Sequence, residues 1–296
     1  MKPDRKTILQ FILPGVVCIA LLLLLPTLRA IYMSFFSMPQ LTSPSNTWKF
    51  VGLDNYAELF QNKQFLISLA NLAKILLGSW FITLFLALML ALSLHSIVKY
   101  RRIFATIIYL PQVISAVAMG YIWILFVYNN NFGLLKQVFS SLGLTSLAKF
   151  PWLKPDNILM AMIIAGIFAA LGQFTIMFIA ALNKIPKSCY EAARIEGASS
   201  VKQLTAITLP LISNEIRSTS IIFISNSIGY FVYPQIFQSI NTSTPMVFTY
   251  TNLFANDLST EVNVGIGTAS AVIMLIMGFV IYYITNFLIK DNNYEY

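Results

Sequence analysis

The sequence has few charged residues, one histidine and two cysteines, and each shortage excludes a class of protein. Asp, Glu, Lys and Arg make up 10% of the 296 residues, whereas soluble domains contain about 25%. Cys18 and Cys189 lie in an apolar run and a polar loop, so they do not form an extracellular disulfide framework. His95 stands alone, no cluster of metal ligands or nucleophiles occurs, and no G-x-x-x-x-G-K-[ST] phosphate loop is present. The sequence therefore indicates no cofactor, metal site or catalytic centre in this chain.

Apolar residues are abundant instead, at 57% of the chain, and the mean hydropathy is +0.74. A helix that crosses a bilayer needs about 20 mostly apolar residues. Six runs meet this length: 11–36, 70–94, 103–127, 158–182, 216–237 and 264–289. The sequence predicts an all-α integral membrane protein with six transmembrane helices and a single transmembrane domain over residues 1–296.

The basic residues are unevenly divided between the predicted loops. With the N-terminus inside, the inner segments hold twelve Lys and Arg residues: Lys2, Arg5, Lys6, Lys99, Arg101, Arg102, Lys184, Lys187, Arg194, Lys202, Arg217 and Lys290. The outer segments hold five: Lys49, Lys63, Lys136, Lys149 and Lys154. Positive charge concentrates on the cytoplasmic side, so the prediction is an N-in, C-in topology. The formal charge of +8 is a topology signal, and no basic-aromatic stripe suggests nucleic acid.

The inner segment 183–215, between the fourth and fifth runs, is polar and prone to form helices. Pro186 suits the first position of a helix, and Gly197 suits the stop, where a positive φ is needed. Ser200 with Gln203 forms a capping-box pattern that predicts a second short helix. Pro210 then predicts a bend toward the fifth run. The outcome is a helix–turn–helix loop on the inner face.

The order Glu191-Ala192-Ala193, Gly197, Ile207 and Leu209-Pro210 resembles the EAA loop of ABC-importer permeases. In that family the loop docks into a groove on a cytoplasmic ATPase, which binds ATP and Mg²⁺. The resemblance implies that segment 183–215 is a coupling-helix loop. The implied ATPase-coupling residues are Glu191, Ala192, Ala193, Gly197, Ile207, Leu209 and Pro210. Glu196 stands where Asp is commoner in the family, which preserves a carboxylate.

Three further stretches resemble carbohydrate-uptake permeases of the maltodextrin type. They are Phe50-Val-Gly-Leu-Asp-Asn-Tyr56, Leu110-Pro111-Gln-Val-Ile-Ser115 followed by Trp123, and Ile185-Pro186 before the EAA segment. The resemblance implies a multi-pass permease of a bacterial or archaeal cell membrane that imports a sugar or oligosaccharide by alternating access. Its implied partners are a second, paralogous permease, two ABC ATPases and an extracellular solute-binding protein.

Aromatic and neutral polar residues near the middle of two runs are candidates for solute binding. Sugars are bound by aromatic faces and by hydrogen bonds to their hydroxyl groups. The candidates are Phe168 and Gln173 in the fourth run and Asn226, Ser227 and Tyr230 in the fifth. The alternative role is to join neighbouring helices by hydrogen bonds.

Other classes of membrane protein are less well supported. A permease for another solute class would have a similar EAA loop, but a charged solute would favour charged residues at mid-span, and none occurs there. Secondary carriers usually keep ionisable groups in their pathway, and a membrane enzyme would need catalytic residues. An importer of a neutral solute, driven by ATP hydrolysis in a partner, therefore fits best.

Overall fold

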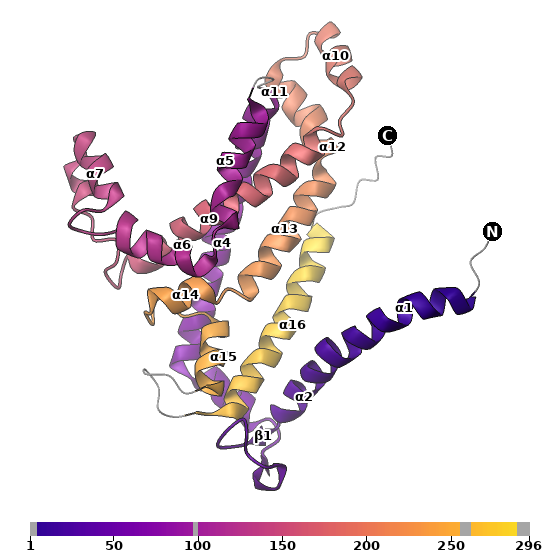
Figure 1. Ribbon diagram of the computed structural model, residues 1–296, viewed down its shortest axis with the longest axis vertical. Coiled ribbons are helices and arrows are strands. Elements are labelled where there is room, and N and C mark those ends of the chain that lie inside the picture. Colours follow the sequence, from indigo (N-terminus) through magenta and orange to yellow (C-terminus); the bar gives the residue numbers. More distant parts are fainter. Residues whose placement is uncertain (1–4, 97–99, 255–261, 289–296) are drawn as a thin grey trace. The chain divides into compact units, whose positions relative to one another are not determined.

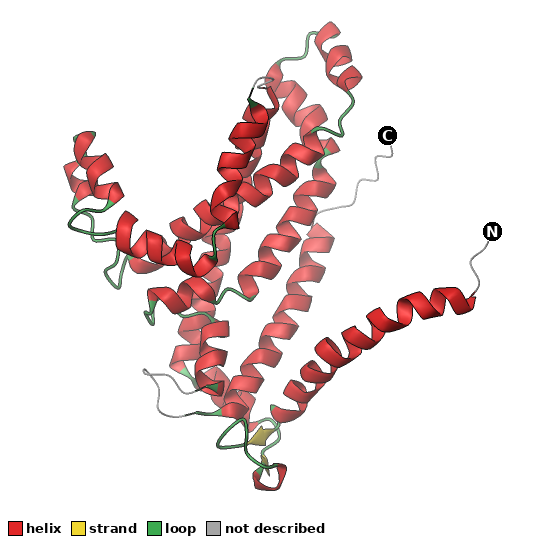
Figure 2. Cartoon of the chain, viewed as in Figure 1, coloured by secondary structure: helices red, strands yellow, loops and turns green. Residues whose placement is uncertain are grey.

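The computed structural model describes residues 5–96, 100–254 and 262–288, and most of these residues are helical (Figures 1 and 2). The chain divides into two compact units, residues 1–66 with 245–276 and residues 67–244 with 277–296. Two long helices, α4 (Lys63–Ser96) and α16 (Val264–Leu288), have residues in both units. The prediction of a single domain therefore stays a prediction.

The first unit begins with a long helical segment made of α1 (Arg5–Ile19), a π-helical turn η1 (Ala20–Leu24) and α2 (Leu25–Met33). The helix ends at Met33, so the predicted run 11–36 extends too far. Phe36 instead pairs with Phe50 in a two-stranded antiparallel sheet. The remaining elements of the unit are β1 (Phe36–Ser37), η2 (Ser45–Thr47), β2 (Lys49–Phe50), α3 (Asp54–Gln61) and α15 (Pro245–Leu253).

Hydrogen bonds from α3 explain why the first helix stops where it does. The Asn55 side-chain amide donates to the carbonyl oxygens of Ser34 (2.8 Å) and Phe36 (3.0 Å). The Tyr56 hydroxyl lies 2.7 Å from the Ser34 Oγ. Carbonyls released at a helix end need such partners. In the motif Phe50–Tyr56, Asn55 and Tyr56 therefore stabilise the fold of the first unit.

The second unit holds most of the remaining helices. They are α5 (Arg101–Val113), α6 (Ala116–Ile122), η3 (Trp123–Val127), α7 (Leu134–Ser141), α8 (Thr145–Ala148), α9 (Ile158–Leu182), α10 (Lys187–Ile195), α11 (Ser200–Gln203), η4 (Leu204–Thr208), α12 (Leu209–Leu211), α13 (Ser213–Ile228) and α14 (Val232–Phe237). Helix α9 packs against α5, α13 and α14. A Cβ at Gly172 of α9 would meet the backbone of Ile108 and Tyr109 in α5. A small residue here lets the two helices approach closely, as is usual between membrane helices.

Two of the predicted spans are interrupted. The run 103–127 forms α5 and then α6 with η3, and the two halves are bent by 95°. The break lies at Ile114 and Ser115, where the Ser115 Oγ accepts a hydrogen bond of 3.3 Å from the Ala118 amide. The run 216–237 breaks after Ile228, and the Tyr230 carbonyl accepts a hydrogen bond of 2.7 Å from Thr244 Oγ1. Side-chain partners make broken helices tolerable in an apolar run.

The count of six continuous transmembrane helices is accordingly not confirmed. The described residues contain four helices long and apolar enough to cross a membrane: Gln10–Met33, Lys63–Ser96, Ile158–Leu182 and Val264–Phe287. The bent pair α5–α6 raises the number to five if it counts as one span. The predicted runs 70–94 and 158–182 lie within observed helices, and the run 264–289 agrees up to Leu288, since residue 289 lies outside the described residues. The N-in, C-in topology stays a prediction.

Candidate functional site

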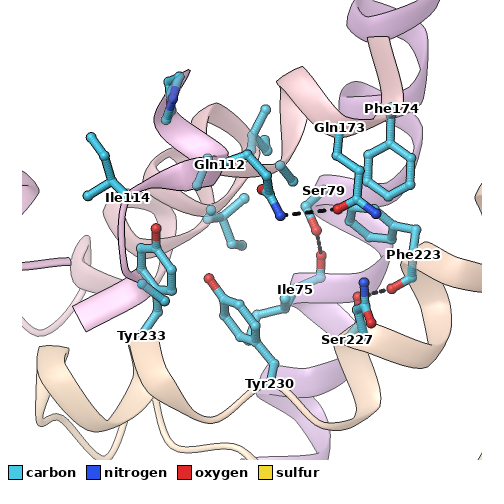
Figure 3. A pocket seen from close by; sticks show the side chains of 18 residues that line it. Ile75, Ser79, Gln112, Ile114, Gln173, Phe174, Phe223, Ser227, Tyr230 and Tyr233 are labelled. Atoms are coloured by element: carbon cyan, nitrogen blue, oxygen red, sulfur yellow. Dashed lines mark hydrogen bonds between the residues drawn. The ribbon is translucent and has the colours of Figure 1, made fainter. Parts of the chain in front are cut away.

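A cavity of about 270 Å³ lies within the second unit, between α4, α5, α9, α13 and α14 (Figure 3). Its size is near the lower end of the range for small-molecule sites, about 300–1,000 Å³. None of the described residues that line it is charged. The breaks after α5 and α13 both border the cavity, so the interrupted spans bring polar groups to it.

Two pairs of side chains give the cavity its chemical character. Gln112 Nε2 donates a hydrogen bond of 3.2 Å to Gln173 Oε1. The rings of Tyr230 and Tyr233 stack with centroids 5.7 Å apart and planes 10° apart. Figure 3 shows the amide pair and the two hydroxyl groups directed toward the same space. This combination suits a solute that offers both a ring face and hydroxyl groups.

The Tyr233 hydroxyl is a buried polar group at this cavity. Tyr233 is buried, and its hydroxyl oxygen has no hydrogen-bond partner among the described residues. A buried hydroxyl without a partner costs free energy, about 1–3 kcal/mol in mutational data. A polar group bound in the cavity would remove this cost.

A glycine on α9 makes room for Tyr230. A Cβ added at Gly166 would lie 2.7 Å from the Tyr230 hydroxyl oxygen. Carbon and oxygen atoms that are not bonded do not approach so closely without displacement. Gly166 therefore allows the Tyr230 hydroxyl to reach its observed position.

Four of the five predicted solute-binding residues line this cavity: Gln173, Asn226, Ser227 and Tyr230. Ser227 Oγ donates to the Phe223 carbonyl (2.9 Å), so its proton is used within α13. Phe168 does not line the cavity. Its side chain is 46% exposed and packs edge to face on Trp123, with centroids 5.4 Å apart.

Sequence reasoning missed Gln112 and Tyr233 as members of the site. Both lie beside the breaks in predicted continuous spans, and a hydropathy pattern alone does not locate such breaks. Gln112 follows Pro111 within an apolar run. Proline disturbs a helix, so a polar amide directly after it could have indicated a break with a polar group beside it. The binding roles of all these residues stay predictions.

A second feature of this unit is the helical loop formed by α10, α11, η4 and α12. Gly197 ends α10 with a φ of +78°. The Gly197 amide donates to the Arg194 carbonyl (3.0 Å), and the Ala198 amide donates to the Ala193 carbonyl (2.8 Å). This pair of bonds is the Schellman motif, in which glycine supplies the left-handed residue. The predicted helix stop at Gly197 is confirmed.

The two predicted helix starts in the loop are each displaced by one residue. Helix α10 begins at Lys187, and Pro186 is its N-cap. Helix α11 is capped by Ser199 rather than Ser200, because the Ser199 Oγ accepts a hydrogen bond of 3.3 Å from the Lys202 amide. The Gln203 side chain does not complete a capping box. Its Nε2 donates to the Ala198 carbonyl at 2.9 Å and so joins α11 to the turn.

The side chains of the loop differ in exposure. Ile195 is 88% exposed and Val201 is 71% exposed, on either side of the Gly197 turn. Glu191, Ala192 and Gly197 are also exposed, and Ala193 is half-buried. The other predicted coupling residues, Ile207, Leu209 and Pro210, are half-buried in the segment that leads to α13. Two large aliphatic side chains left exposed beside small residues form a surface suited to a protein partner.

Comparison with known proteins identifies the family. Residues 83–292 match the family described as "Binding-protein-dependent transport system inner membrane component". A probable ABC transporter permease of Pyrococcus horikoshii is 30% identical over 284 residues, which cover 94% of each chain. The diacetylchitobiose uptake system permease NgcF of Streptomyces coelicolor is 30% identical over 243 residues, covering 78% of this chain and 68% of the relative.

The fold agrees with this match. A bacterial ABC transporter that imports the acidic polysaccharide alginate contains a chain with a TM-score of 0.79 and 23% identity. The alignment covers 96% of this chain and 94% of that chain. The sequence match over most of the chain and the shared helical fold lead to one conclusion: this chain belongs to the family of inner-membrane components of binding-protein-dependent transport systems, the permeases of ABC transporters.

Proposed function

We propose that this permease forms half of the path by which an ATP-driven importer takes up a neutral sugar or oligosaccharide. The observation that carries the proposal is the uncharged cavity with its stacked tyrosines, amide pair and unpartnered Tyr233 hydroxyl. Aromatic faces contact the apolar faces of sugar rings, and amide and hydroxyl groups bond to sugar hydroxyls. The names of two relatives, for diacetylchitobiose and for arabinooligosaccharides, support this class of solute.

A different solute class is the second candidate. The permease UgpA of Yersinia pestis, named for sn-glycerol-3-phosphate transport, is 29% identical over 208 residues. An anionic solute in a low-dielectric site would need cationic partners. None lines the described cavity, so a neutral solute is the better fit. A secondary carrier fits less well still, for the same lack of ionisable groups.

The helical loop is proposed as the contact with a cytoplasmic ABC ATPase. This requires the N-in, C-in orientation, which we propose from the distribution of Lys and Arg. Ile195 and Val201 would enter apolar recesses of the ATPase, and the small side chains of Ala192 and Ala193 would permit close approach. ATP-driven movement of two ATPases would then be passed through this loop to α13, which lines the cavity.

The complete importer is proposed to contain a second, paralogous permease, two ATPases that bind ATP and Mg²⁺, and an extracellular solute-binding protein. A solved alginate transporter was obtained with an alginate pentasaccharide-bound periplasmic protein, which supports the last of these partners. We place the assembly in the cell membrane of a bacterium or archaeon. The mechanism would be alternating access, with the cavity open to one side at a time.

Substitutions in the cavity test the solute-binding role. The variants Tyr233→Ala and Gln112→Ala should each raise the KM for sugar uptake by about tenfold, because each removes contacts to the solute. Phe168→Ala is a matched control, since this aromatic residue of α9 lies outside the cavity. The comparison uses the reconstituted complex, with ATPase content measured in parallel. Equal KM values for all three variants and the unmodified chain would exclude this cavity as the solute site.

A further inference from the structure

A second and larger cavity, of about 930 Å³, lies in the second unit beside the helical loop. Its walls are the end of α4, the start of α5, the end of α9 and the segment from α10 to η4. Figure 1 shows α10 and α11 near the same end of this unit as the start of α5. None of its lining residues belongs to the uncharged cavity between α4, α5, α9, α13 and α14.

Basic side chains dominate the charge of this cavity. Arg101, Lys187 and Arg194 line it together with His95, and Glu191 is the one carboxylate among its described lining residues. Three basic side chains against one carboxylate leave the lining with a net positive charge, which attracts an anion. The charge balance therefore favours an anionic ligand.

Asn183 holds two of these groups in place. Its Oδ1 accepts a hydrogen bond of 2.9 Å from Arg101 Nη2, and its side chain also hydrogen-bonds with His95. His95 in turn lies within the electrostatic influence of Arg101 and Lys187. An arginine has five N–H donors, and the bond to Asn183 uses one of them. The remaining N–H donors of Arg101 are therefore held beside the cavity, and binding a ligand there would cost little further side-chain entropy.

The cavity also has room for more than a simple ion. Apolar side chains of Leu92, Leu182, Ile185 and Leu204 form part of its wall. A ligand that combines an anionic group with a less polar body would contact both kinds of surface. Guanidinium and ammonium groups together are the usual protein partners of phosphate oxygens.

We propose that this cavity binds a phosphate-bearing anion, supplied by a phospholipid headgroup or by a soluble phosphorylated metabolite. Such a ligand would connect Arg101 at the start of α5 to Lys187 and Arg194 on α10. It would thereby hold the helical loop against the α4–α5 end of the unit and regulate its movement. Binding of this anion does not depend on which solute the importer transports.

The test measures binding to the complete, purified importer by native mass spectrometry. One arm adds glucose 6-phosphate as a soluble phosphate monoester. The other arm compares complexes extracted from bilayers of phosphatidylglycerol and of phosphatidylcholine. We expect one phosphate-bearing ligand per copy of this chain in one of the two arms, and the arm identifies its source.

The paired variant Arg101→Gln with Lys187→Gln should weaken this binding by about tenfold or more, because charge-assisted hydrogen bonds are lost. The matched control is Lys136→Gln with Lys149→Gln, which removes two positive charges outside this cavity. If the paired variant fails to assemble with the ATPase, Lys187→Gln alone should still weaken binding by about threefold, the loss of one solvent-accessible ion pair. Absence of ligand in both arms would overturn the proposal, as would binding that is equal in the variants and the control. Binding to the isolated chain but not to the complex would also overturn it, because the ATPase would then cover the cavity.

Discussion

The Tyr190 hydroxyl lies 2.9 Å from Thr208 Oγ1 and so joins α10 to η4, two helical segments separated by the Gly197 turn. Thr208 Oγ1 is also 3.3 Å from the Gln203 carbonyl, to which it donates. These bonds hold α10 against the end of η4 across the Gly197 turn. A loop of this kind can transmit a force, whereas a flexible loop would absorb it.

Removing the hydrogen bond between Tyr190 and Thr208 should weaken the coupling of ATP hydrolysis to transport more than it weakens the stability of the fold. Tyr190→Phe deletes one hydrogen bond, which contributes about 0.5–1.5 kcal/mol. We expect a lower ratio of solute transported to ATP hydrolysed by the reconstituted complex. The control is Tyr56→Phe, which deletes a similar bond of 2.7 Å to the Ser34 Oγ in the first unit. An unchanged transport ratio in Tyr190→Phe would show that this bond has no part in coupling.

Gly197 should be needed for its backbone conformation alone. Its φ is +78°, and no atom of the described residues lies within 4 Å of an added Cβ. Gly197→Ala should therefore cost about 1–2 kcal/mol of local strain and weaken ATPase binding by about fivefold or more. Gly143→Ala is a matched control, with a φ of +74° and open space around its Cβ. The affinity of the ATPase for the immobilised permease should fall for Gly197→Ala only. A similar loss of affinity in both variants would show that the Gly197 turn has no special part in ATPase binding.

The exposed side chain of Ile195 should contribute directly to ATPase binding. Ile195→Ala removes about three buried carbon atoms from the proposed interface, which corresponds to roughly 2 kcal/mol and an affinity loss of about 30-fold. Leu142→Ala is the control, because Leu142 is 65% exposed on the predicted outer loop. Titration of the ATPase onto the purified permease measures both. Equal affinity for the Ile195 variant and the unmodified chain would mean that the ATPase does not contact this side chain.

Gly166 should determine where Tyr230 lies. In Gly166→Ala, the new methyl group would lie 2.7 Å from the Tyr230 hydroxyl oxygen and displace it. The expected result is a rise of about tenfold in the KM for solute uptake, with assembly unchanged. In the control, Gly78→Ala, the nearest atom to the new methyl group is Ile163 Cδ1 at 3.7 Å, an ordinary contact. If Gly78→Ala and Gly166→Ala raise KM equally, general overpacking explains the effect and Tyr230 is not its cause.

The fourth and sixth runs were predictable from sequence, since long uninterrupted apolar segments leave a helix as the only way to pair their backbone groups. The runs 103–127 and 216–237 are less uniformly apolar, with Pro111 in the first and Arg217, Gly229 and Pro234 in the second, and each is broken. The second break is stabilised by a tertiary partner, since Thr244 Oγ1 donates to the Tyr230 carbonyl. At the first break, Ser115 caps α6 locally. These breaks are also what brings Gln112 and Tyr233 to the cavity. The sequence pattern thus located Gln173, Asn226, Ser227 and Tyr230, and it missed Gln112 and Tyr233, which lie beside the breaks.

The helical loop was more predictable because its determinants are local. Gly197 alone indicates a left-handed turn, and the bonds from its neighbours complete the motif. The helix starts were harder to place, since both Ser199 and Ser200 can cap a helix and only the folded turn distinguishes them. Exposure of Ile195 and Val201 was not visible in the pattern, because aliphatic residues in a polar loop are equally consistent with burial.

Solute uptake by the complete importer tests the central claim most directly. Proteoliposomes that contain this permease, its paralogous partner, the ATPases and the solute-binding protein would be given labelled neutral oligosaccharides and labelled charged solutes, with and without ATP. The uncharged, tyrosine-lined cavity predicts ATP-dependent uptake of at least one neutral sugar. ATP-dependent uptake of a charged solute, with none of any neutral sugar, would contradict the assignment of a neutral sugar.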